Sequence, residues 1–403
     1  MNRQIHQVTI LVLVMFLTLC TSVTSVQGLA RPALWEASSS QGTLTTDSRN
    51  SRTVYAEFGT DRGQIIVGGD AIADSVSSDD AYAYQRTYPQ GELYAPITGY
   101  FSTSYASMTG LERAGNTVLN GEDPSLFSSR VKSLITGQTQ RGGSLELTID
   151  PEVQQAAWDA LAGRRGSVVA LNPSTGAILA MVSSPSYDPN LLASHEDGVA
   201  ETAYESLSND EARPLDNRAI GGNLYPPGST FKTITAAAAI DNVDDIDSFE
   251  YTCSGVTYVN GSPIRCTNGQ AHGHVDFEMA LAKSCNGAFG EITRKIGASN
   301  MKEYVKKVGL TNSLNISGIK TAKGKFNFPA DDPIKLSWAG IGQADDLVNP
   351  ASMMVYMGSI ANGGKAVNPY LIGSSSFLKK VTGGDSLGKY LSEATADRLK
   401  SMM

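Results

Sequence analysis

The first pattern along the chain is an apolar stretch over residues 8–28 that contains no charged side chain. A helix of about 20 residues, rising about 1.5 Å per residue, reaches across the roughly 30 Å hydrocarbon layer of a membrane. Arg3 precedes the stretch, and positive charge favours the cytoplasmic side. The alternative is a cleaved signal peptide, but no small-x-small cleavage site follows at once. We predict a cytoplasmic tail over residues 1–7, a transmembrane anchor over 8–28 and an extracytoplasmic remainder.

The segment after the apolar stretch changes character twice. Its first part ends in a run rich in Ser, Thr and Gln, which predicts an exposed stalk over residues 29–52. From Thr53 to Ser75, apolar and polar residues alternate around glycines, as they do in a β-hairpin. The chain then stays turn-rich and mixed. We predict that residues 53–143 form a small β-rich module without catalytic residues, of the pedestal or dimerisation type.

Strand patterns followed by several helical patterns characterise residues 144–403. Pro151 is well placed to open a helix, and two apolar strands flank the turn at 172–176. The predicted strands are 145–150, 167–171 and 177–182, and the predicted helical stretches are 152–161, 230–240, 277–296 and 301–308. This order is typical of an α+β domain in which helices flank a mostly antiparallel sheet.

Composition excludes several kinds of function. Of the 403 residues, 32 are Lys or Arg and 40 are Asp or Glu, so the net charge is −8, and no basic cluster marks a nucleic-acid site. Cys253 and Cys266 lie in a polar stretch and form either a disulfide or two free thiols. His272 and His274 could clip a metal, but no third ligand lies at a recognisable spacing. We therefore expect no metal and no cofactor. Any catalytic groups are expected to be Ser, Lys, Asn or carboxylate side chains.

The most informative segment is Tyr225–Lys232, which reads Tyr-Pro-Pro-Gly-Ser-Thr-Phe-Lys. The prolines forbid a helix, Gly228 permits a sharp turn, and an Ala-rich helix follows. Ser229 is thus expected at a helix N-terminus, which favours developing negative charge. Lys232, three residues later, falls on the same helical face. A buried and neutral Lys232 could take the proton from the Ser229 hydroxyl.

The Ser-x-x-Lys spacing is not specific by itself. It also occurs, without a preceding Pro-Pro-Gly turn, at Ser129–Lys132, Ser299–Lys302, Ser317–Lys320, Ser376–Lys379 and Ser386–Lys389. We interpret these five as incidental surface residues.

A second element is the Ser-Cys-Asn sequence at Ser284–Asn286, between two helical segments. A hydroxyl and an amide two residues apart on a short turn can point into one cleft, where the hydroxyl relays a proton and the amide holds a substrate amide. The alternative for Ser284 is a helix cap.

Taken together, the Pro-Gly-Ser-Thr-Phe-Lys and Ser-Cys-Asn motifs resemble the active site of the penicillin-binding transpeptidases. The chain is closest to class B members, of the actinobacterial penicillin-binding protein A type. Further segments resemble class B landmarks, in the same order: Arg62–Ile65, Gly110–Glu112, Thr148–Gln154, Asn217–Ala219, Gly340–Gln343, Val348–Ser352 and Ala361–Gly364. The resemblance implies a transpeptidase domain of the serine β-lactamase-like fold.

The resemblance also implies an activity, that of a D,D-transpeptidase that cross-links peptidoglycan stem peptides. Ser229 would form an acyl-enzyme, Lys232 would be its base, Ser284 would shuttle a proton, and Asn286 would position the peptide. β-Lactams would acylate Ser229 by the same route. The implied location is the bacterial cell membrane, with the catalytic domain outside it and proteins of division or elongation as partners.

One feature of the family is missing. No Lys-Thr or Lys-Ser pair in this chain is followed by Gly, although the family carries such a motif on a strand beyond a helix like residues 394–403. We interpret the sequence as truncated at its C-terminus. That strand supplies one oxyanion donor, and losing such a donor typically costs about 10²–10³ in rate. The 403 residues are therefore expected to fold poorly and to bind penicillin weakly or not at all.

Two other functions stay open at this point. The chain could be a non-catalytic scaffold of the division or elongation machinery with the same fold, or a membrane β-lactam sensor. A sensor usually needs a cytoplasmic signalling segment, and only about seven residues precede the predicted anchor.

Overall fold

A computed structural model describes residues 12–21, 58–123, 141–375 and 384–403. The chain divides into two compact units, residues 1–59 and 60–403. In the first unit, residues 12–21 are helical. Among the described residues, no helix combines the length and apolar character needed to span a membrane. The predicted tail and stalk lie outside the described residues, as does part of the predicted anchor, so these remain predictions.

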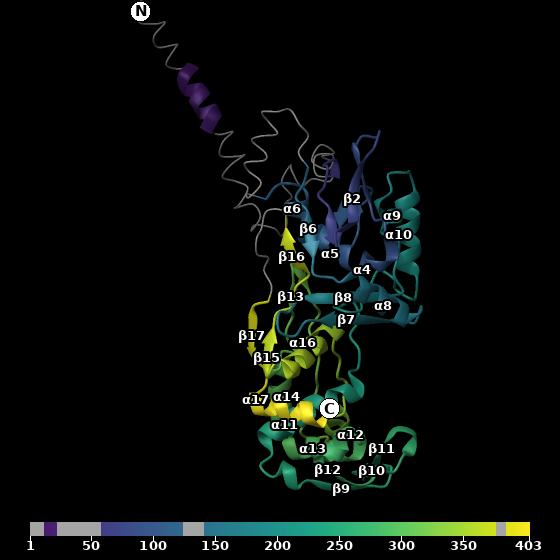
Figure 1. The fold of residues 1–403 in the computed structure, drawn as a ribbon, viewed down its shortest axis with the longest axis vertical. Helices are drawn as coiled ribbons and strands as arrows, with labels where there is room; N and C mark the ends of the chain where they lie inside the picture. Colours follow the sequence, from purple (N-terminus) through teal and green to yellow (C-terminus); the bar gives the residue numbers. More distant parts are fainter. Residues whose placement is uncertain (1–11, 22–57, 124–140, 376–383) are drawn as a thin grey trace, which may run out of the picture. The chain divides into compact units, whose positions relative to one another are not determined.

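The largest sheet of the second unit has five strands in the order β16-β6-β1-β2-β3. Its strands are β1 (Ile65–Val67), β2 (Asp70–Ser77), β3 (Tyr84–Thr87), β6 (Leu145–Leu147) and β16 (Ile372–Ser375). The hairpin predicted around Gly68 and Gly69 is confirmed, since β1 pairs antiparallel with β2 across these glycines. β6 then pairs parallel with β1 and antiparallel with β16. The sheet therefore joins residues from both sides of the boundary predicted at 143/144 (Figure 1).

A buried ion network holds the first part of this unit together. Glu112, on helix α5 (Gly110–Ala114), accepts hydrogen bonds from the guanidinium groups of Arg62 and Arg86, with distances of 2.7–3.1 Å. Arg62 also lies over the ring of Phe101, 4.3 Å from its centroid. All three charged side chains are fully buried. This network joins α5 to β3 and to the residues before β1.

The hairpin predicted on either side of residues 172–176 is also confirmed. β7 (Gly166–Leu171) pairs antiparallel with β8 (Ile178–Ser184). Helix α8 (Pro151–Leu161) begins at the predicted proline, and the Asp150 carboxylate caps it by accepting from two backbone N–H groups. From α8, the buried Gln154 side chain donates to the Met181 carbonyl and accepts from the Met181 N–H. This amide pair fixes α8 against β8.

The sheet expected within residues 144–403 differs from its prediction. In the described part of the chain, β7 and β8 form a sheet of only two strands, and β6 and β16 belong to the five-stranded sheet instead. The physical reason is burial, because Leu145 and Leu147 of β6 face the same core as Ile65 of β1. The other pairs are short: β4–β5 (Phe101–Ser102, Ser107–Met108), β9–β12 (Glu250–Cys253, Gly273–Asp276), β10–β11 (Val256–Val259, Ser262–Arg265), β13–β14 (Asn315–Ile316, Ile319–Lys320) and β15–β17 (Lys365–Val367, Ser386–Lys389). The α+β class holds.

Helices make up most of the remainder. They are α4 (Ala95–Thr98), α6 (Asn116–Leu119), α9 (Pro189–Ala193), α10 (Val199–Asn209), α11 (Lys232–Asn242), α12 (Phe277–Ala282), α13 (Asn286–Ile296), α14 (Ala298–Lys307), α15 (Pro333–Ala339), α16 (Pro350–Ala361) and α17 (Glu393–Met402). The helices expected near 230–240, 277–296 and 301–308 are present, but the second is broken at Lys283–Cys285 into α12 and α13. That break is where the Ser-Cys-Asn motif lies.

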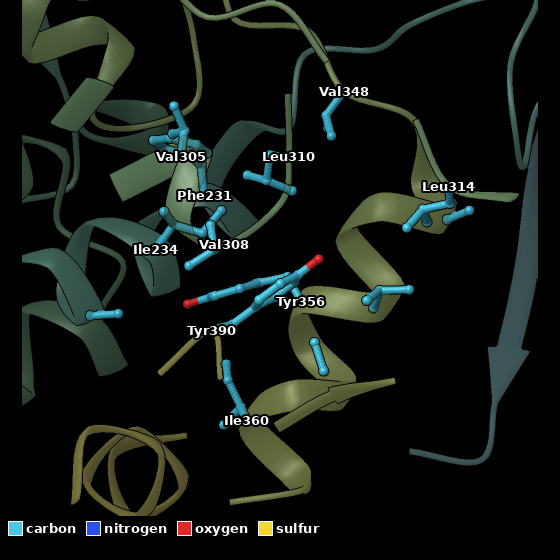
Figure 2. Close-up of a cluster of buried hydrophobic side chains, with 14 of the residues drawn as sticks. Phe231, Ile234, Val305, Val308, Leu310, Leu314, Val348, Tyr356, Ile360 and Tyr390 are labelled. Carbon is cyan, nitrogen blue, oxygen red and sulfur yellow. The ribbon is translucent and has the colours of Figure 1, made fainter. Parts of the chain in front are cut away.

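Helix α11 is the centre of the helical core. Its first eight residues are all buried, and they include four consecutive alanines. A helix that is apolar on every face is stable only when protein surrounds it, and α13, α14 and α17 pack against α11. Figure 2 shows Tyr356 and Tyr390 at the centre of an adjoining cluster of buried side chains that also includes Phe231 and Ile234. The Ser-x-x-Lys motif at the start of α11 is thus attached to the buried part of this helix.

Candidate active site

Ser229 lies in a single 3-10 turn, Gly228–Phe231, that leads directly into α11. The side chain is exposed, whereas Phe231, two residues later, is fully buried and anchors the turn. Tyr225, at the start of the motif, exchanges two backbone hydrogen bonds with Val348, each 2.9 Å long. The turn is therefore fixed at one end by the backbone hydrogen bonds of Tyr225 and at the other by the buried side chain of Phe231.

Two glycines let a second segment approach this elbow closely. The Gly228 N–H donates to the Gly342 carbonyl at 2.9 Å, and both residues have positive φ, +58° and +74°. A Cβ on Gly342 would lie 2.2 Å from the Gly228 oxygen, which no real contact allows. The Gly-Ile-Gly-Gln segment that resembled a family landmark thus packs against the turn that contains Ser229.

The amine of Lys232 connects the two motifs predicted from the sequence. Its Nζ lies 3.3 Å from the Ser229 Oγ and 2.8 Å from the Ser284 Oγ. It also donates to the Ser284 carbonyl at 2.7 Å and to the Asn286 Oδ1 at 2.5 Å. The side chain is only 1% exposed. The structure therefore brings all four predicted site residues around one buried amine.

The turn between α12 and α13 presents Ser284 and Asn286 to this amine. Ser284 has a left-handed backbone, with φ +50°, and its side chain is exposed. Cys285 is fully buried and is the residue immediately before α13. Asn286 is fixed on its other side, because its Nδ2 donates to the Arg265 carbonyl at 2.8 Å. Ser284 is a turn residue and not the helix cap that was the alternative.

Burial changes the protonation of Lys232. Loss of hydration disfavours the ammonium form and lowers the pKa of Lys232 to about 8, although the Cys266 and Cys285 side chains act in the opposite direction. A lysine with such a pKa holds a useful fraction of neutral amine near neutral pH. The neutral amine is the form that accepts a proton from a hydroxyl.

The other Ser-x-x-Lys sequences do not form such a site where the structure describes them. Ser299 is exposed on α14, and the Ser317 Oγ accepts from the backbone N–H groups of Leu371 and Ile372. The Ser386 Oγ accepts from the Gly388 N–H. Ser129–Lys132 and Ser376–Lys379 lie outside the described residues.

One cluster was missed by the sequence analysis. Cys253, Cys266, Cys285 and His272 come together, and their ligand atoms all lie within 4.8 Å of one another. The cysteines are free thiols, so the structure contains no disulfide between Cys253 and Cys266. His274, the other half of the suspected His-x-His pair, is exposed and lies near Glu250 instead. No local spacing signals this cluster, because strand pairing and tertiary packing bring its members together; β9–β12 pairing, for example, places Cys253 beside His272.

The fold and the site define a class of protein. Residues 166–403 match the family model of the penicillin binding protein transpeptidase domain, and residues 62–145 match that of the penicillin binding protein A dimerisation domain. Since the first match covers more than half of the chain, the chain belongs to the penicillin-binding transpeptidase family.

Within this family the similarity points to one type. The peptidoglycan D,D-transpeptidase PbpA of Mycolicibacterium smegmatis is 40% identical over 386 residues, which cover 93% of this chain and 75% of the relative. PbpA of Mycobacterium tuberculosis is 38% identical, with the same coverage. The ceftriaxone acyl-enzyme complex of M. tuberculosis penicillin-binding protein A matches with a TM-score of 0.80 and 38% identity, covering 87% of this chain and 81% of that one. Its penicillin G acyl-enzyme complex matches with a TM-score of 0.79 over 85% and 81%.

Proposed function

We propose that this chain is a peptidoglycan D,D-transpeptidase in which Ser229 forms the acyl-enzyme. The observation that carries the proposal is the position of the Lys232 amine, within hydrogen-bond reach of the Ser229 and Ser284 hydroxyls. A serine hydroxyl needs an adjacent base to act as a nucleophile, and the amine is that base. The names of the relatives support the same activity.

In acylation, neutral Lys232 removes the proton from Ser229 as the oxygen attacks the carbonyl carbon of the penultimate D-Ala. The Ser229–carbon bond forms, and the peptide bond to the terminal D-Ala breaks when its nitrogen receives a proton. Ser284 passes that proton from the Lys232 ammonium to the leaving nitrogen, because its hydroxyl lies 2.8 Å from Nζ. Asn286 orients the stem peptide through its amide.

The second half of the reaction runs through the same groups. An amine of a neighbouring stem peptide attacks the ester carbon and forms a new amide bond, while its proton passes through Ser284 to Lys232. Lys232 then returns a proton to the Ser229 oxygen as the ester bond breaks. A β-lactam acylates Ser229 in the first step, since its strained amide replaces the D-Ala–D-Ala bond.

The negative charge that develops on the carbonyl oxygen faces the start of the turn and helix that follow Ser229. Backbone N–H groups there point outward, and the helix dipole adds positive potential. The second donor that relatives draw from a Lys-Thr-Gly or Lys-Ser-Gly strand has no counterpart among this chain's Lys-Thr and Lys-Ser pairs.

The setting of the enzyme is also part of the proposal. Residues 8–28 would anchor it in the bacterial cell membrane, with residues 53–143 as a non-catalytic module and 144–403 as the transpeptidase domain. The substrates would be peptidoglycan stem peptides. Membrane proteins of cell division or elongation would be its partners.

The proposal is tested by identifying the residue to which penicillin becomes covalently attached. The chain is incubated with penicillin G until labelling stops, digested, and searched by mass spectrometry for the adduct. We expect slow modification of the peptide that contains Ser229, and none in Ser229→Ala. Ser299→Ala is the matched control, because Ser299–Lys302 has the same spacing on an exposed helix, and it should label like the unchanged chain. An adduct that persists in Ser229→Ala, or one on another residue of the unchanged chain, would contradict the assignment.

A further inference from the structure

Three thiols and one imidazole lie close together beside the turn that contains Ser284. Cys253 and Cys266 are 3% and 4% exposed, Cys285 is fully buried, and His272 is half-buried. The distance between the sulfurs of Cys253 and Cys266 is 3.7 Å, and that between the sulfurs of Cys266 and Cys285 is 3.9 Å. The Nδ1 atom of His272 lies 3.5 Å from the Cys253 sulfur. The proposed transpeptidase reaction uses none of these four side chains.

Three of the six separations between the ligand atoms match those around one tetrahedral metal ion, and all six lie within 4.8 Å. Tetrahedral zinc, with Zn–S bonds of about 2.3 Å and Zn–N bonds of about 2.0–2.1 Å, places two sulfurs about 3.8 Å apart and a sulfur and a nitrogen about 3.6 Å apart. The three measured separations lie within about 0.1 Å of these values. A disulfide between Cys253 and Cys266 would account for only two of the four groups. A Cys₃His set is a standard ligand set of structural zinc sites.

We propose that Cys253, Cys266, His272 and Cys285 bind one Zn²⁺ ion in a closed structural site. The ligands come from four places in the sequence. Cys253 ends β9, Cys266 follows β11, His272 precedes β12, and Cys285 is the residue before α13. On binding, each thiol gives up its proton to solvent, and three sulfurs and one nitrogen donate electron pairs to the ion. No oxidant or reductant takes part.

Two features near the sulfurs favour the thiolate form and oppose the burial that raises the pKa of the Cys285 thiol. The Gly255 N–H points at the Cys253 sulfur at 3.4 Å. Cys285 occupies the N-terminal end of the eleven-residue helix α13, where the helix dipole favours negative charge. With four protein ligands, no position is left open for a catalytic water, so the ion has a structural role.

The proposed ion would connect the β9–β12 strand pair and the β10–β11 hairpin to the start of α13. Cys285 is the residue between Ser284 and Asn286, so the ion would fix the backbone of the turn that presents both. Because the ion binds the folded chain, it should raise the free energy of unfolding according to its affinity and concentration.

The experiment measures metal directly and does not depend on transpeptidase activity. The full chain is purified in a reductant that does not bind metal, exchanged into buffer with zinc, and freed of loosely bound ions. Zinc and protein are then quantified by elemental mass spectrometry. We expect one zinc per chain. Replacement of zinc by Co²⁺ should give the near-ultraviolet charge-transfer absorption of thiolate-bound cobalt.

Matched variants separate this site from adventitious binding. His272→Ala removes a half-buried ligand and should weaken zinc affinity at least about 100-fold, as measured by competition with a chromophoric chelator. His274→Ala, two residues later on an exposed side chain, should leave the affinity unchanged. Cys266→Ser should abolish the cobalt absorption, and Cys20→Ser should retain it. The thermal midpoint of the unchanged chain should fall when zinc is removed, whereas that of His272→Ala should not respond.

Three results would overturn the proposal. One is a chain that retains no zinc, and another is equal loss of zinc in His274→Ala and His272→Ala. The third is a Cys253–Cys266 disulfide in the native chain, detected as two cysteines that resist alkylation until they are reduced.

Discussion

The amine of Lys232 is buried among hydroxyl, carbonyl and amide groups without a carboxylate to pair with. Among the described residues, no acidic side chain forms an ion pair with it, and its hydrogen-bond partners all belong to Ser229, Ser284 and Asn286. Burial of an unpaired ammonium is costly, and this cost lowers the pKa of Lys232 to about 8. Because burial favours the neutral amine, it also allows Lys232 to act as a base.

This pKa predicts how acylation depends on pH. Because the neutral amine is the reactive form, the acylation rate with penicillin G should rise through a midpoint near pH 8, with about a tenfold gain between pH 7 and the plateau. The measurement is the second-order rate constant from pH 6 to pH 10, by stopped incubation and mass spectrometry. Lys232→Arg, which stays protonated, should show no such rise. A flat profile in the unchanged chain would argue against Lys232 as the base.

Asp346 is a buried carboxyl group with an incomplete set of partners. Its side chain is fully buried, one oxygen accepts from the Asn327 N–H at 3.1 Å, and the other has no partner within the described residues. Loss of hydration therefore raises the pKa of Asp346 to about 7. The neighbouring Asp345 is exposed and pairs with Lys335 at 2.6 Å.

Asp346 should make the fold less stable as pH rises. Its folded-state pKa lies above the unfolded value of 3.8, so between about pH 4 and pH 7 the unfolded chain releases a proton that the folded chain keeps. The free energy of unfolding should fall across this window by at most about 4 kcal/mol and then level off. Asp346→Asn should remove most of this slope in urea titrations at several pH values. Asp345→Asn, the exposed control, should keep it, and an unchanged slope in Asp346→Asn would refute the prediction.

At the scale of elements, the ion network of Glu112 joins α5 to two parts of the five-stranded sheet. Burial alone would raise the pKa of Glu112, but Arg86 and Arg62 outweigh burial and lower it. The carboxylate is therefore charged in the folded state, and the stability it contributes is lost as pH falls below its unfolded value. The two arginines depend on this one carboxylate for compensation.

Removing the charge of Glu112 should strongly destabilise the fold. Glu112→Gln keeps the shape but leaves two buried guanidinium groups without a counter-ion, so the free energy of unfolding should drop by about 3–5 kcal/mol. The measurement is urea unfolding at neutral pH. Asp397→Asn breaks an exposed pair with Lys400 and should change stability by less than about 1 kcal/mol. A loss in Glu112→Gln no larger than in this control would contradict the account.

At the scale of the whole molecule, β7 is an open edge. It pairs with β8 on one side, and within the described residues no strand pairs with its other side. Helices α8 and α16 contact this strand, and all six of its residues are half-buried. An edge of this kind, with Val168, Val169 and Leu171 in it, is a template for pairing with another chain.

We predict that the chain self-associates through β7. The mass measured by light scattering after gel filtration should rise with protein concentration, and backbone amides of residues 166–171 should gain protection from hydrogen exchange as it does. Amides of β8, already paired with β7, should change little and serve as the internal reference. A mass that stays constant over a wide concentration range would contradict this prediction.

How much of the molecule could be predicted from sequence depends on separation along the chain. Pro151 at the start of α8, the turn at 172–176 and the helix after Ser229 are local features, and the structure confirms them. The mixed sheet was not predicted, because β1 and β6 meet across about 80 residues and no local pattern encodes their parallel pairing. The helical stretch predicted over 277–296 ran through the α12–α13 break because both segments have helical spacing, although the Ser-Cys-Asn motif was itself placed between two helical segments.

The same rule applies to the site. Ser229 and Lys232 are three residues apart, so helical geometry alone placed them together. Ser284 and Asn286 were joined to them by resemblance to a family, since nothing local connects residues so far apart. The cysteine and histidine cluster has gaps of 13, 6 and 13 residues, which match no familiar metal-binding spacing. The pairing of β9 with β12 brings Cys253 beside His272, and tertiary packing adds Cys266, after β11, and Cys285, before α13.

The pairing of β6 with β16 has a consequence for biosynthesis. Leu147 meets Ile372 in the sheet, so 225 residues must leave the ribosome before the earlier strand finds its neighbour. At the usual rate of synthesis this interval is on the order of tens of seconds. During this interval β6 can pair with the earlier strand β1 but not with β16, so the sheet keeps one open edge until the last part of the chain arrives.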